Sequence, residues 1–170
     1  ISTLKFHIRF NIDKKFMELS GVDFSLAQPG EILDQKLSGL KWITPNYKNN
    51  PKKELLLLLE SKNKIIKEKK TKILITDYQI LPSITKTLKF APNKWFDDLS
   101  VPSKENKYFN TYKKFFEKKI IEQSIQVIFI VGKNKSKYLI NHFTDERCIS
   151  QDRINEIMLK LNIEKCKFKN

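Results

Sequence analysis

Residues 125–131, Ile-Gln-Val-Ile-Phe-Ile-Val, carry the strongest strand pattern of the chain, and Gly132 follows them directly. A second apolar stretch, Lys-Ile-Leu-Ile-Thr at residues 72–76, has the same character. Short, continuous runs of β-branched apolar residues are typical of strands buried on both faces, as in parallel sheets. The two stretches therefore predict a pair of central strands that run parallel.

Helical patterns stand before and between these strands. Asn50 and Pro51 suit the N-cap and the first position of a helix that runs to about residue 70. A short helix is predicted over residues 80–87. Ser103 can cap a longer helix, whose buried face is predicted to hold five large side chains: Tyr108, Tyr112, Phe115, Phe116 and Ile120.

The order of these elements is helix, strand, helix, strand. This order predicts an α/β fold, a three-layer sandwich with a mainly parallel central sheet, Rossmann-like, in a single domain of residues 1–170. Alternating apolar and polar residues predict a half-buried strand over residues 5–12, and shorter strands are predicted over residues 40–43 and 138–143.

The C-terminal stretch predicts a short helix between two cysteines, Cys148 and Cys166. Ser150 can cap it, while Ile149 and Ile154 take the positions of a hydrophobic staple. Such a helix is about 16 Å long, and the five residues after it can reach back about 17 Å. The cysteines are therefore a disulfide candidate, which would imply an oxidising compartment. Two free thiols are the alternative.

The composition is strongly basic, with a formal net charge of +14. Net charge of this sign suits an anionic partner, such as nucleic acid or an acidic membrane surface. However, only Arg9, Arg147 and Arg153 are arginines, and arginine is the residue that reads phosphates and bases bidentately. The many lysines, asparagines and isoleucines are typical of an AT-rich genome. We therefore expect a solvated lysine surface and do not expect nucleic acid as the partner, with a functional basic face as the alternative.

Motifs of self-sufficient catalysis are missing from the sequence. Its four glycines cannot form GxGxxG or a P-loop, and two histidines without a neighbouring cysteine cluster do not make a zinc site. We expect no catalytic residue, cofactor or metal in this chain.

Two polar clusters are candidates for ligand binding. Asp77, Tyr78 and Gln79 follow the strand at residues 72–76, and Gly132 and Lys133 follow the strand at residues 125–131. Ligands of open α/β sheets bind outside the carboxyl ends of the strands. The alternative is that Asp77 caps the next helix and Tyr78 packs in the core.

The second cluster contains Asn93 and Trp95, where an aromatic side chain beside an amide suits stacking on a sugar or contact with a partner. A buried tryptophan that anchors a loop is the alternative.

Several short motifs together resemble a known family. Residues 39–45 read Gly-Leu-Lys-Trp-Ile-Thr-Pro, and residues 75–79 read Ile-Thr-Asp-Tyr-Gln. Ala-Pro-Asn at residues 91–93, Asn-Lys-Tyr at residues 106–108 and the two cysteines follow. Over about residues 30–170, this series resembles the C-terminal soluble region of polytopic glycosyltransferase-like proteins of marine bacteria, of the dolichyl-phosphate-mannose–protein mannosyltransferase type.

The resemblance implies a parent membrane enzyme that uses a polyprenyl-phosphate sugar and whose catalytic acid lies outside this chain. It also implies a location at the periplasmic face of the inner membrane. Because the chain begins with Ile1 and not with Met, we expect a fragment of a longer membrane protein. Its partners would be the membrane-embedded remainder and a glycan or polyprenyl-phosphate-sugar acceptor.

The leading functional expectation is thus an extramembrane accessory domain that binds a glycan, an acceptor or a partner without catalysis. One alternative is a cytoplasmic α/β enzyme whose site combines residues 77–79, Asp-Tyr-Gln, with Gly132 and Lys133. Free thiols and a deep polar pocket at the strand ends would favour it. Another is a basic nucleic-acid-binding domain, which predicts lysines on one face and binding that falls steeply with salt.

Overall fold

The computed structural model describes residues 19, 21–87, 91, 96, 100–132, 136–142 and 146–168. The strand predicted over residues 5–12 lies outside them. The chain separates into two compact units, Ile1–Leu56 and Leu57–Asn170, which we describe in turn. The single domain expected for residues 1–170 stays a prediction.

The first unit contains a small antiparallel pair, β1 (Gln28–Pro29) with β2 (Lys41–Trp42), so the strand predicted near residue 40 is confirmed. Gly30 follows β1 directly, and its N–H donates to the carbonyl oxygen of Leu40 at 2.8 Å. A Cβ at position 30 would lie 2.9 Å from the carbonyl oxygen of Leu37, so the chain can turn this tightly only around a glycine.

Helix α2 (Pro51–Lys67) begins as its sequence predicts, because the Asn50 Oδ1 accepts from the Lys53 N–H at 3.0 Å. In its first turn Glu54 is fully buried. The Glu54 carboxylate accepts from the indole Nε1 of Trp42 at 2.8 Å and from the hydroxyl of Thr44 at 2.8 Å. These charge-assisted hydrogen bonds tie β2 and the segment after it to the start of α2.

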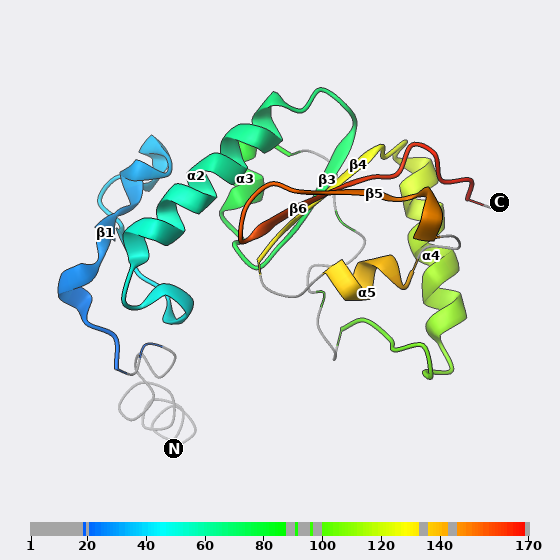
Figure 1. The fold of residues 1–170 in the computed structure, drawn as a ribbon, viewed down its shortest axis with the longest axis horizontal. Coiled ribbons are helices and arrows are strands. Elements are labelled where there is room, and N and C mark those ends of the chain that lie inside the picture. The colour runs from blue at the N-terminus through cyan, green and yellow to red at the C-terminus, as the bar shows by residue number, and fades with distance from the viewer. Residues whose placement is uncertain are drawn as a thin grey trace, which may run out of the picture. The chain divides into compact units, whose positions relative to one another are not determined.

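The second unit is built on a four-stranded sheet (Figure 1). Its order is β3 (Lys72–Thr76), β4 (Val127–Val131), β6 (Met158–Asn162) and β5 (Ser150–Arg153). Only β3 and β4 run parallel, while the β4–β6 and β6–β5 pairs are antiparallel. The predicted Rossmann-like sandwich with a mainly parallel sheet is therefore wrong.

The error has a physical cause. The continuous apolar run of β4 indicates a strand that is buried on both faces. A central strand is buried in this way in a mixed sheet as well as in a parallel one. Its second edge is taken by β6, which pairs with all five residues of β4.

The short C-terminal helix predicted after Ser150 is also wrong, since this stretch forms the β5–β6 hairpin. Asn155 holds the turn: its Oδ1 accepts from the Ile157 N–H at 3.0 Å. Its Nδ2 donates to the carbonyl oxygen of Leu57 at 3.2 Å and to the Glu60 carboxylate at 2.9 Å, both on α2. Pairing with β4 and this anchor outweigh a helical pattern worth only tenths of a kcal/mol per residue.

Three further helices complete the described part of this unit: α3 (Leu81–Thr85), α4 (Phe109–Glu122) and α5 (Ser136–Ile140). Helix α5 replaces the strand predicted over residues 138–143. Helix α4 starts later than predicted and is not capped by Ser103. Instead, the Asn106 Oδ1 accepts from the Tyr108 N–H at 2.9 Å in the turn that leads into the helix.

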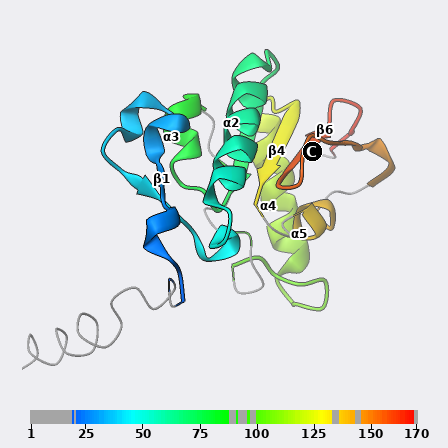
Figure 2. The same cartoon turned by 60° about the vertical axis from the view of Figure 1, so that its left-hand side comes forward.

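Helix α4 runs along the sheet (Figure 2) and shares the main apolar core with one of its faces. Phe116 and Ile120 of α4 are almost completely buried there. They belong to a cluster with side chains of three strands: Ile73, Ile75, Ile128, Ile130 and Leu161. Burial of this apolar area is the main force that holds α4 to the sheet.

Cys148 and Cys166 are joined by a disulfide, with their Cα atoms 4.9 Å apart. The predicted route through a helix is wrong, but the hairpin also brings the two residues together. Ser150 at the start of β5 pairs with Asn162 at the end of β6, so the segments just outside this pair meet. The bond fastens the C-terminal tail to the hairpin.

Candidate functional site

The first predicted cluster lies at the carboxyl ends of the two parallel strands. Asp77 follows β3 and Gly132 follows β4, and the two are in contact: a Cβ at position 132 would lie 2.7 Å from the Asp77 Oδ2. The backbone N–H of Gly132 donates to the carbonyl oxygen of Ile157 at 2.9 Å. Parallel pairing therefore brings Asp77 and Gly132 together as expected, and the φ of +129° favours glycine at position 132.

Thr76 organises the rest of this cluster. Its hydroxyl accepts from the Tyr78 N–H at 2.9 Å, and its carbonyl oxygen accepts from the Gln79 Nε2 at 3.0 Å. The N-cap residue of α3 is Ile80, whose side chain makes no capping hydrogen bond. Both Asp77 and Gln79 are exposed, and Tyr78 is half-buried. Their predicted role in ligand binding stays a prediction.

Three other predicted site residues lie outside the described residues: Asn93, Trp95 and Lys133.

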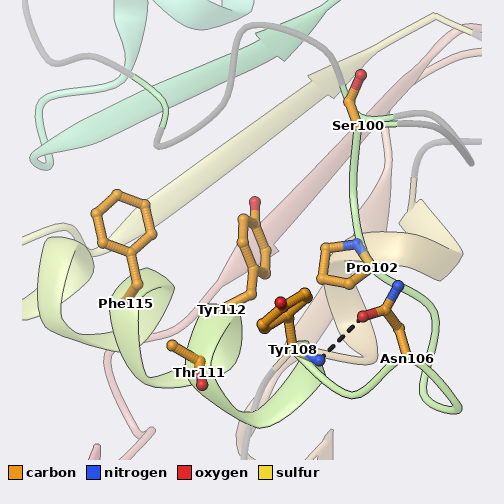
Figure 3. A pocket seen from close by; sticks show the side chains of 7 residues that line it. All are labelled: Ser100, Pro102, Asn106, Tyr108, Thr111, Tyr112 and Phe115. Carbon is orange, nitrogen blue, oxygen red and sulfur yellow. Dashed lines mark hydrogen bonds between the residues drawn. The ribbon is translucent and has the colours of Figure 1, made fainter.

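A pocket of about 510 Å³ lies along the first turns of α4 and the loop before it (Figure 3). The described residues that line it are uncharged, and three of them are aromatic: Ser100, Pro102, Asn106, Tyr108, Thr111, Tyr112 and Phe115. Tyr108 is 60% exposed and Phe115 is 42% exposed, so two aromatic rings of the lining are open to solvent. Figure 3 shows the rings of Tyr108, Tyr112 and Phe115 standing in a row along the helix.

The sequence pattern had placed Tyr108 and Phe115 on the buried face of the helix, and that prediction is wrong. At about 100° per residue, both lie roughly a quarter turn away from Phe116, which points into the core. Tyr112 lies between the two directions and is half-buried. The signal was present in the sequence, since so many large side chains within fourteen residues exceed what one helix face can bury.

Tyr112 forms the inner wall of the pocket. Its hydroxyl is buried and has no hydrogen-bond partner among the described residues. Burial raises the pKa of Tyr112 well above its ordinary value, so the phenol stays protonated and can act as a donor. Asn106, Thr111 and Ser100 add amide and hydroxyl groups at the rim. The pocket thus offers apolar ring faces together with uncharged hydrogen-bonding groups.

His142 lies behind this wall and is almost completely buried. Its ring is 4.8 Å from that of Tyr112 and 5.9 Å from that of Phe116, and its Nδ1 donates to the carbonyl oxygen of Tyr138. The Nε2 has no partner within the described part of the chain. Burial, more than the nearby charge of Lys113, lowers the pKa of His142 below its ordinary 6.5.

This burial predicts an acid-sensitive fold. Because the pKa of His142 is lower in the folded chain, the unfolded chain binds a proton there more strongly below pH 6.5. The free energy of unfolding therefore falls as the pH drops from 6.5 towards the pKa of the folded chain. Urea unfolding between pH 7.5 and 5 measures this slope. Replacement of His142 by phenylalanine should flatten it. An equal slope in the parent and in His142→Phe would contradict the assignment.

Among the residues that the structure describes, no group of three His, Cys, Asp or Glu side chains could hold a metal ion. Over the same residues, no helix has the length and apolarity that a membrane crossing needs. Comparisons with protein-family models, with curated proteins and with solved structures found no match.

Proposed function

We propose that this chain is a non-catalytic accessory domain of a glycosyltransferase-like membrane protein and that it binds glycan at the pocket on α4. The observation that carries the proposal is the row of aromatic side chains along this helix, two of them open to solvent. Burial of such rings would stabilise the fold, so their exposure favours a role in binding.

The chemistry of the pocket suits a sugar. A pyranose ring has one face of C–H groups, which stacks on an aromatic ring, and a rim of hydroxyl groups, which need hydrogen-bond partners. Tyr108 and Phe115 supply the stacking faces, and Asn106 and Thr111 supply an amide and a hydroxyl beside them. Binding sites commonly combine an apolar surface with a few placed polar groups in this way.

The disulfide supports the location that the proposal needs. Disulfides persist in oxidising compartments such as the bacterial periplasm and are rare in the cytosol. A bond between Cys148 and Cys166 therefore agrees with a domain at the periplasmic face of the inner membrane.

The test is binding to a panel of neutral and acidic oligosaccharides, measured by calorimetry. Tyr108→Ala and Phe115→Ala should each weaken binding on the order of tenfold, because each removes a stacking face worth about 1.4 kcal/mol. Ile121→Ala is the matched control: it truncates a side chain of α4 that is 40% exposed but does not line this pocket. Unchanged binding by Tyr108→Ala and Phe115→Ala would place the ligand elsewhere, and a chain that binds no member of the panel would overturn the proposal.

A further inference from the structure

The pocket on α4 has a cation beside each exposed ring, and the two cations differ in their partners. The Lys107 ammonium lies 4.8 Å from the centre of the Tyr108 ring, and the Lys119 ammonium lies 5.9 Å from the centre of the Phe115 ring. Lys119 is paired with Glu122 at 2.7 Å. No carboxylate pairs with Lys107 among the described residues, so its charge is available to a ligand.

The sequence around the pocket is also positively charged. Residues 103–119 contain six lysines and two glutamates, and one of these, Glu117, is buried. None of the described residues that line the pocket is acidic. Among the described residues, a negative group that enters the pocket therefore meets the ammonium of Lys107 and no carboxylate of the lining.

We infer that the glycan bound here is acidic and carries a carboxylate or sulfate group on the sugar that stacks on Tyr108. In this arrangement the C–H face of the sugar stacks on the Tyr108 ring, and its anionic group pairs with Lys107, whose ammonium lies over the same ring. Lys107 already lies beside the ring through its cation–π contact, so little side-chain freedom is lost when the ion pair forms. This inference rests on the proposed glycan-binding function and adds the charge of the ligand.

The experiment compares oligosaccharides with and without anionic groups. Calorimetry would measure the binding of a galacturonic acid tetramer, its uncharged methyl ester and a sulfated tetramer of a neutral sugar. The chains would be the parent, Lys107→Gln and Lys119→Gln. The last is a matched control, because it removes the same charge from the same segment while Glu122 already occupies that lysine.

We expect the parent chain to bind at least one anionic tetramer about threefold more tightly than the methyl ester, with a preference that shrinks as salt rises. Lys107→Gln should remove most of this preference and leave the methyl ester unaffected, while Lys119→Gln should change the binding of the anionic tetramer less than about twofold. The carboxylated and sulfated ligands show which anion is preferred.

Each other outcome has a distinct meaning. Equal binding of charged and uncharged tetramers by the parent would overturn the acidic ligand and leave the glycan-binding function standing. If Lys107→Gln and Lys119→Gln weaken the binding of the anionic tetramer equally, the preference comes from the overall positive charge of the segment. This outcome would overturn the role of Lys107. Binding of none of the tetramers, with tight salt-dependent binding of an oligothymidine instead, would overturn both proposals.

Discussion

Replacement of both Cys148 and Cys166 by serine is expected to lower the free energy of unfolding by about 3 kcal/mol. The disulfide spans 18 residues, and closing a loop of this size restricts the unfolded chain by about that amount. In the folded chain it holds the C-terminal tail, where Cys166 and Phe168 pack against the main core. Loss of the bond should therefore also loosen this edge of the fold.

Urea unfolding of the parent and the double-serine chain, each with and without reductant, measures the effect. Reductant should lower the stability of the parent to that of the double-serine chain and should leave the latter unchanged. If the two chains unfold alike without reductant, the bond either does not form or does not constrain the unfolded state. The proposal for an oxidising compartment would then lose its structural support.

Gly132→Ala is expected to cost about 3 kcal/mol, because two effects add. Its φ of +129° is a conformation that alanine rarely adopts, with a cost on the order of 1–3 kcal/mol. In addition, the new methyl group would meet the Asp77 carboxylate at 2.7 Å, so this side chain would have to turn away from position 132. Urea unfolding measures the total cost.

Gly39→Ala separates the two effects, since Gly39 also has a positive φ, of +81°, but has no atom within 4 Å of the added Cβ. It should cost only about 1 kcal/mol. Adding Asp77→Ala to Gly132→Ala should recover the part that comes from the contact and leave the backbone part. If Gly132→Ala costs no more than Gly39→Ala, the close approach of the two strand ends is refuted.

Part of the candidate site could be recognised in the sequence. The contact between Asp77 and Gly132 follows from the pairing of two apolar strands whose carboxyl ends share an edge. The aromatic pocket could not be located in this way. The spacing of Tyr108 and Phe115 is compatible with either a buried or an exposed face, and which face packs depends on the sheet that the helix meets.

Local interactions account for the features that the residues themselves dictate. Asn50 and Pro51 begin α2 because an Asn cap and a proline at the first position act within one turn. The positions of β3 and β4 follow from runs of β-branched apolar residues, which are stable only when extended and buried.

Contacts between distant parts of the chain account for the rest. Residues 158–162 form a strand because β4 offers an unpaired edge, and Asn155 turns the chain because α2 offers its acceptors. Such partners lie far away in the sequence, so no local pattern reveals them. Hence the sequence alone determined the strands β3 and β4 and the start of α2. The antiparallel pairing of β6, the β5–β6 hairpin and the exposed aromatic row were decided by tertiary packing.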